Sequence, residues 1–151
     1  MTPNHDEATE KAPVEAITPG VYAATQASPL IDLADFQAAT LLLHTGIGGI
    51  AFTAANYLQY SVTHGDAADG SDQLAVGAND IVVDAVAPAT ITNGVVRLIN
   101  AAKAAADVQK VGYIAGRRYL KVTASFAGTH ATGTPIAVTV VKEDGIVQGA
   151  A

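Results

Sequence analysis

An alternation of apolar and polar residues is clearest between residues 118 and 126. Every second position there is apolar: Leu120, Val122, Ala124 and Phe126. Successive side chains of a β-strand point to opposite faces of a sheet, so a period of two is typical of a strand with one buried face. The pattern predicts a strand here, with Leu120, Val122 and Phe126 in the core.

Short apolar runs separated by glycine-rich turns predict further strands. The run from Ile50 to His64 also shows the period of two, at Leu58, Tyr60 and Val62. The other expected strands lie at residues 30–36, 39–45, 81–86, 95–99, 108–114 and 136–142. Strands of this length and spacing are typical of an all-β sandwich or barrel.

The segments between the runs contain turn-forming residues. Gly46–Gly49, Asn93–Gly94 and Ala115–Gly116 are interpreted as hairpin turns, because Asn and Gly tolerate the positive φ angles of tight hairpins. Residues 101–108 are rich in alanine, which favours helix. This segment is the only helix expected, and its two-turn length leaves a structured loop as the alternative.

The fold class expected from these elements is all-β, as a single β-sandwich or jelly-roll-like barrel with at most one short helix. The sandwich domain is expected over residues 30–145, and residues 146–151 form a C-terminal tail. Residues 1–29 hold four of the six prolines, including Pro13 and Pro19, and show no helical or strand period. Proline fixes φ and removes a backbone donor, so this stretch is interpreted as an extended N-terminal arm. Either a disordered terminus or an arm that orders against a neighbouring subunit fits that description.

Composition excludes several classes of site and partner. Of the 151 residues, 50% are hydrophobic, only 5% are aromatic and none is cysteine. The absence of cysteine excludes a disulfide scaffold, a cysteine zinc site, an iron–sulfur cluster and thiol catalysis. No apolar run is long enough for a membrane helix, and the start of the chain does not resemble a signal peptide. The net charge of −6 opposes nucleic-acid binding as a main role.

The charges are unevenly distributed along the chain. Residues 1–96 hold eleven acidic residues and the single base Lys11, whereas residues 97–151 hold seven bases and three acids. Two interpretations stay open: internal balance between neighbouring strands, or a charged face that docks on a partner. The candidate interface combines a small basic cluster with residues of the expected arm: Arg117, Arg118 and Lys121 of the cluster, and Pro13, Pro19 and Tyr22 of the arm.

No pattern of catalytic or metal-binding residues is present. The histidines His5, His44, His64 and His130 form no local zinc-binding pair, and no serine lies in a Gly-x-Ser-x-Gly motif. Asp66, Asp69 and Asp72 are spaced unlike an EF-hand, so a solvated loop is favoured over a weak cation site. We therefore expect no enzyme activity, no catalytic residue and no cofactor.

Two segments carry a resemblance to a protein family. Val111–Thr123, which contains Gly-Tyr-Ile-Ala-Gly-Arg-Arg-Tyr, and Phe126–Val138, which contains Gly-Thr-Pro, resemble small head-associated virion proteins of tailed bacteriophages. The segment Leu33–Leu43 is similar to that family's opening strand, and the resemblance covers residues 30–145. It implies a structural role as a decoration (cement) protein on the capsid surface of the virion, assembled in the host cytoplasm. The implied partners are the major capsid protein and further copies of the chain, with a homotrimer favoured because capsid lattices offer three-fold positions.

Other functions remain open from sequence. A head–tail connector or tail component is the nearest alternative among virion proteins. A carbohydrate-binding β-sandwich is a second alternative, although the chain has no tryptophan to stack on sugars. A small hydrolase assembled from distant residues is a third.

Overall fold

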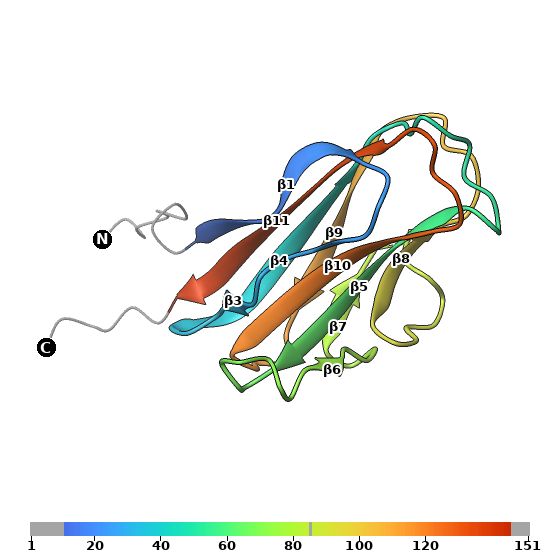
Figure 1. Cartoon of the computed structure of the whole chain (residues 1–151). Helices are drawn as coiled ribbons and strands as arrows, with labels where there is room; N and C mark the ends of the chain where they lie inside the picture. The colour runs from blue at the N-terminus through green and yellow to red at the C-terminus, as the bar shows by residue number, and fades with distance from the viewer. Residues whose placement is uncertain (1–10, 85, 146–151) are drawn as a thin grey trace, which may run out of the picture.

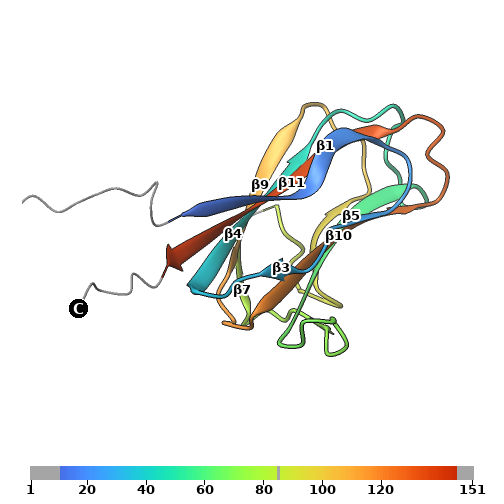
Figure 2. The ribbon, with the colours of Figure 1, turned by 60° about the vertical axis from the view of Figure 1, so that its left-hand side comes forward.

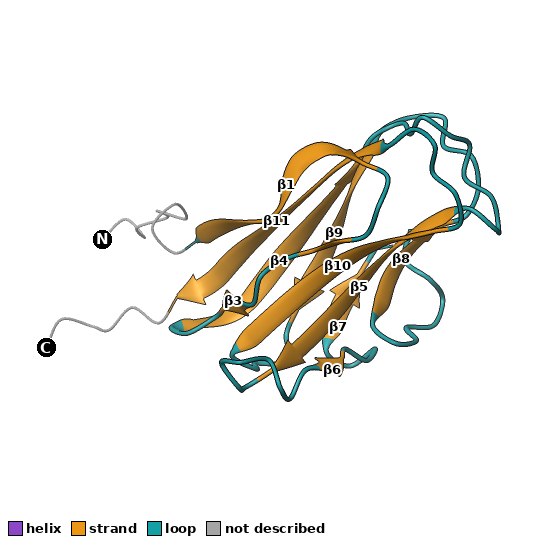
Figure 3. Cartoon of the chain, in the orientation of Figure 1, coloured by secondary structure: helices purple, strands orange, loops and turns teal. Residues whose placement is uncertain are grey.

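The described part of the chain, residues 11–84 and 86–145 of the computed structural model, is made of β-strands and loops (Figure 1). Figure 3 shows strands and loops, and no helix, over these residues. The strands are β1 (Ala12–Tyr22), β2 (Gln26–Ala27), β3 (Ile31–Asp32), β4 (Phe36–Thr45), β5 (Tyr57–Gly65), β6 (Leu74–Ala75), β7 (Ile81–Val83), β8 (Val95–Ile99), β9 (Asp107–Tyr113), β10 (Tyr119–Ala127) and β11 (Thr134–Gly145).

Two antiparallel sheets form the two layers of the molecule. The first, here called sheet A, has the strand order β1-β11-β4-β9-β7. The second, sheet B, has the order β2-β10-β5-β6, with β3 paired to β10 and β8 paired to β5. Figure 2 shows the two layers facing each other. The sheets do not close into a barrel, so the expected all-β sandwich is confirmed and the barrel alternative is not.

Alternate residues of the long strands fill the space between the sheets. Leu41 and Leu43 of sheet A, and Leu120 and Val122 of sheet B, are fully buried. Burial alternates along β4 from Ala38 to Thr45 and along β5 from Tyr57 to His64, as the period of two requires. The expected core positions Leu120 and Val122 are thereby confirmed. Phe126, also expected in the core, is only half-buried and packs against its edge, which corrects that expectation.

The proline-rich segment is part of the sandwich, which corrects the boundary expected at residue 29. Strand β1 pairs with β11 over Ala12–Tyr22, and β2 pairs with β10. β1 lies at the edge of sheet A, where one side of the strand has no neighbour and proline is tolerated. Its register shifts twice between Glu15 and Gly20, around Pro19. Prolines and bulges at an edge hinder further strand pairing. Residues 1–10 and the expected tail 146–151 lie outside the described residues.

The expected helix at residues 101–108 is wrong. The segment is a loop up to residue 106, and β9 begins at Asp107. Two turns of helix are too short to be stable without packing, since helix nucleation is costly. The ion pair between Lys103 and Asp107, 2.8 Å apart, instead connects this loop to the start of β9.

The expected turns form, but they do not make the expected hairpins. Asn93 and Gly94 have φ angles of 51° and 72°, as a tight turn requires, yet the following β8 pairs with β5. The turn at Gly116 leads from β9 in sheet A to β10 in sheet B. The segment after Gly46 likewise crosses from β4 to β5, and β5 begins only at Tyr57 rather than near Ile50.

Candidate functional site

The predicted interface residues lie on two different sheets. Arg117, Arg118 and Lys121 belong to β10 and the turn before it, in sheet B. The other three lie on the edge strand β1 of sheet A: Pro13, Pro19 and Tyr22. Along β1, Pro13 pairs with Val141 and Tyr22 with Thr134, at opposite ends of the strand. The structure therefore divides the predicted interface into an arginine cluster and a set of edge-strand residues.

Both arginines form ion pairs with the acidic first half of the chain. Arg118 donates two hydrogen bonds, each 3.0 Å, to the two carboxylate oxygens of Asp32. The hydrogen bond from Arg118 holds the pKa of Asp32 below its usual value. Arg117 lies 3.0 Å from Asp66. These pairs show that part of the charge asymmetry is balanced internally, although exposed ion pairs of this kind contribute little to the stability of a fold.

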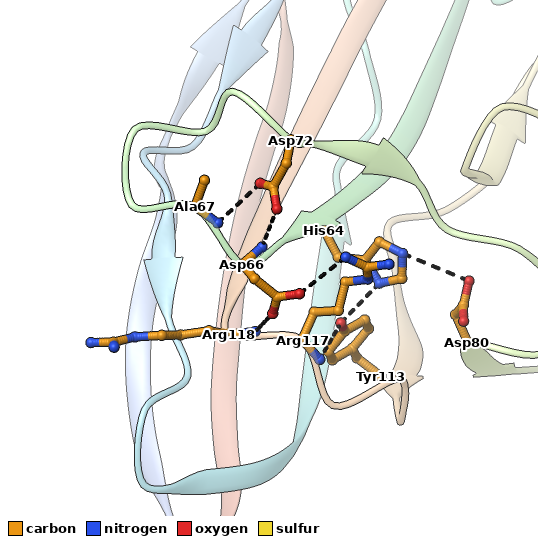
Figure 4. Close-up of polar contacts among 8 residues, drawn as sticks. All are labelled: His64, Asp66, Ala67, Asp72, Asp80, Tyr113, Arg117 and Arg118. Carbon is orange, nitrogen blue, oxygen red and sulfur yellow. Dashed lines mark hydrogen bonds and ion pairs between the residues drawn. The ribbon is translucent and has the colours of Figure 1, made fainter.

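The acidic loop after β5 is held by hydrogen bonds from its own backbone (Figure 4). Asp72 accepts hydrogen bonds from the N–H groups of Asp66 (2.8 Å) and Ala67 (3.0 Å), which lower its pKa. Asp66 accepts a further hydrogen bond from the N–H of Arg118 at 3.1 Å. Within residues 11–84 and 86–145 no group of three His, Cys, Asp or Glu side chains could hold a metal ion. The carboxylates of Asp66 and Asp72 serve to shape the loop and its contact with the β9–β10 turn.

A buried histidine connects this loop region to both sheets (Figure 4). His64 of β5 is 5% exposed, and its Nδ1 lies 2.9 Å from the hydroxyl of Tyr113 on β9. The same hydroxyl accepts a hydrogen bond from the N–H of Arg117. The other ring nitrogen, Nε2, lies 3.9 Å from the carboxylate of Asp80. Burial lowers the pKa of His64 and raises that of Tyr113 to about 12, so both side chains are neutral at pH 7.

The lowered pKa of His64 predicts that the fold loses stability as the pH falls through about 6.5. The unfolded chain takes up a proton at the ordinary histidine pKa, whereas the folded chain does so only at lower pH. Urea unfolding at pH 7.5 and pH 5 should therefore show a lower free energy of unfolding at pH 5. In the variant His64→Gln, the free energy of unfolding should fall less between pH 7.5 and pH 5 than in the native chain. In the control variant His44→Gln, it should fall as much as in the native chain. An equal drop in His64→Gln and the native chain would refute this role of His64.

The other described histidines have unrelated surroundings. His130 packs edge-on against the ring of Phe126, with the ring centres 5.1 Å apart, and its Nε2 lies 2.8 Å from the carbonyl oxygen of Ala127. His44 is on the outward side of β4. Among residues 11–84 and 86–145, the structure thus places His44, His64 and His130 in three separate environments.

The outer faces of the two sheets differ in polarity. The outward positions of β5 and β10 in sheet B are mostly polar, namely Gln59, Ser61, Thr63, Tyr119, Lys121, Thr123 and Ser125. The outward positions of the four long strands of sheet A are mostly small, apolar or uncharged: Pro13, Pro19, Val21, Ala38, Thr40, Leu42, His44, Val108, Gly112, Ala137, Thr139 and Val141. Three charged residues, Glu15, Lys110 and Glu143, belong to the same set, and Glu143 accepts a hydrogen bond of 3.0 Å from the hydroxyl of Thr40. We call this second set the A face. Extended apolar surfaces of this kind are typical of interaction sites.

The A face is hollowed at one end. An open hollow of about 450 Å³ lies among Pro19, Val21, His44, Val108 and Ala137. Val21 and Val108 are 66% and 53% exposed, which is unusual for valine in a strand. Pro19, predicted as an interface residue, is part of this hollow. The candidate functional site is therefore the A face with this hollow.

Sequence analysis missed the A face, although a signal for it was present. The run at residues 39–45 is mostly apolar, which predicts a buried strand. In the structure one side of this run fills the core, and the other side belongs to the A face. A continuous apolar run also fits a strand whose second side is covered by a partner.

The chain was compared with family models, curated proteins and solved structures. None of the three comparisons finds a match. Within the described residues, no helix is long and apolar enough to cross a membrane.

Proposed function

We propose that this chain is a structural virion protein that decorates and stabilises the head of a tailed bacteriophage. In this role it binds the major capsid protein and acts as a homo-oligomer on the capsid surface. The A face carries this proposal. Its apolar outward residues, among them Leu42, Val108 and Val141, are costly to leave in water and favour burial against protein. A chain with such a face suits a subunit of a larger assembly.

The arginine cluster supplies a second, polar contact surface. Arg117 and Arg118 are 38% and 54% exposed at the side chain, although each is paired with a carboxylate. Arginine is favoured at protein interfaces because its planar group makes several directed hydrogen bonds. We assign contact with the capsid protein to this end of the sandwich. Weak contacts at each subunit then add up over the shell, since a multivalent array gains from avidity.

The location of the chain in purified particles tests this function. Cryo-electron microscopy of the virus that encodes the chain should show its sandwich at regular positions over the head. Heads assembled without the chain should release their genome at a lower temperature than complete heads. Density confined to the portal vertex would instead support the connector alternative, and particles without the chain would overturn a virion role.

A further inference from the structure

The pairing of strands arranges the A face in rows that run across the sheet. Figure 1 shows β9, β4, β11 and β1 side by side, and the register aligns their outward residues. The middle row is Lys110, Leu42, Thr139 and Glu15. The next row is Gly112, Thr40, Val141 and Pro13. Each row has a different kind of residue at its two ends.

The two ends of the middle row carry opposite charges. Lys110 lies on β9 and Glu15 on β1, with Leu42 and Thr139 between them. Within the described part of the chain neither Lys110 nor Glu15 takes part in an ion pair. Glu15 accepts a hydrogen bond of 2.6 Å from the hydroxyl of its neighbour Thr18. Among the described residues, both charges thus lack an oppositely charged partner within ion-pair distance, although Asp84 lines the same hollow as Lys110.

The ends of the next row complement each other in shape. Pro13 is exposed on β1. Gly112 on β9 has no side chain, and an open hollow of about 330 Å³ lies beside it, among Thr40, Val82 and Lys110. A projecting ring at one end of the row thus matches a recess at the other end.

We propose that the A face binds the A face of a second copy of this chain, forming a two-fold symmetric dimer. The symmetry axis lies midway between the two stacked sheets. It is parallel to the strands and passes over the line between β4 and β11. A half-turn about this axis places β9 of one copy over β1 of the other, and β4 over β11. Lys110 then faces Glu15 of the partner copy, and Gly112 receives Pro13, each contact occurring twice. Sheets that pack face to face in this way keep their strands within about 30° of each other and lie about 10 Å apart.

This arrangement also has a consequence for the oligomeric state. A surface that binds itself makes an isologous contact, which closes after two copies. A homotrimer, which we expected from sequence, instead needs two different surfaces on each copy. The inference rests on the proposed assembly role of the A face. Its test uses the purified chain alone, so self-association can fail while the head location still holds.

Charge reversal in the full-length chain tests the dimer. Analytical ultracentrifugation from micromolar to millimolar concentration should show a monomer–dimer equilibrium for the native chain. Lys110→Glu and Glu15→Lys should each weaken the dimer by at least about tenfold, because each places two pairs of like charges together. An equimolar mixture of the two variants should restore dimerisation, since a mixed dimer has opposite charges at both contacts. The matched control Lys121→Glu, on the outer face of sheet B, should dimerise like the native chain.

A second variant tests the fit in shape. A Cβ atom at Gly112 would come no nearer than 3.5 Å to Val82, an ordinary contact, so Gly112→Val should fold as a monomer. Its side chain should block Pro13 of the partner copy and weaken the dimer. A native chain that stays monomeric, a trimer, or a dimer unaffected by the Lys110, Glu15 and Gly112 variants would each overturn the proposal. A monomer whose A face binds the capsid protein instead would overturn self-pairing while supporting the proposed function.

Discussion

Replacing Leu120 with alanine should lower the free energy of unfolding by about 2–5 kcal/mol. The side chain of Leu120 is fully buried between the two sheets, on the strand that joins β5 to β2 and β3. Alanine removes three carbon atoms and leaves a cavity that strands held on both sides cannot close. Urea unfolding followed by circular dichroism, at one fixed protein concentration, measures the loss.

Two matched variants of sheet B calibrate this result. Leu98→Ala removes the same atoms from a side chain that is 41% exposed on β8, so its loss should be below about 1 kcal/mol. Phe126→Ala should fall between the two leucine variants, because Phe126 is half-buried. Equal losses of stability in Leu98→Ala and Leu120→Ala would mean that the inward and outward sides of β8 and β10 are assigned wrongly.

Replacing Asp107 with asparagine should lower the free energy of unfolding by about 3 kcal/mol, the lower end for a broken buried ion pair. Its carboxylate accepts a hydrogen bond from Arg97, which is 6% exposed on β8 of sheet B, and lies 2.8 Å from the ammonium of Lys103. Burial alone would raise the pKa of Asp107, but the hydrogen bonds from Lys103 and Arg97 outweigh burial and lower it. Asparagine removes the negative charge of Asp107 and leaves the two cations of Arg97 and Lys103 close together. We take the lower end because the carboxylate is 39% exposed.

Replacing the other partner of this pair, in the variant Arg97→Met, should lower the free energy of unfolding by less than Asp107→Asn does. Methionine keeps much of the volume of the arginine stem and removes the buried charge, while Asp107 keeps its pair with Lys103. Urea unfolding of both variants at pH 7 gives the comparison. A larger loss for Arg97→Met would mean that the hydrogen bond between the sheets, rather than the uncompensated charge, dominates at this site.

Local patterns were sufficient to predict the class of fold and the inward side of its clearest strand. The period of two at Leu120 and Val122 is a property of a few neighbouring residues, and it places them in the core whichever strand lies beside them. Turn chemistry was predicted for the same reason at Asn93–Gly94, whose positive φ angles are a local preference. At residues 101–108 the local pattern predicted a helix that does not form. The helix propensity of a short alanine-rich segment is weak, and tertiary contacts such as the ion pair of Asp107 with Arg97 outweigh it.

Strand partners, and the surfaces that they create, were decided only by the tertiary structure. A turn does not specify whether the chain stays in one sheet or crosses to the other, so β9 and β10 were expected as a hairpin and instead lie in different sheets. Prolines in residues 12–22 indicated an arm, yet an edge position in sheet A accommodates them as a strand. The A face combines positions from four strands that are distant in the sequence, and Lys110 and Glu15 share a row only through three successive pairings. Side-chain alternation depends on neighbours in the chain, whereas the composition of a sheet face depends on long-range pairing energies that no local pattern records.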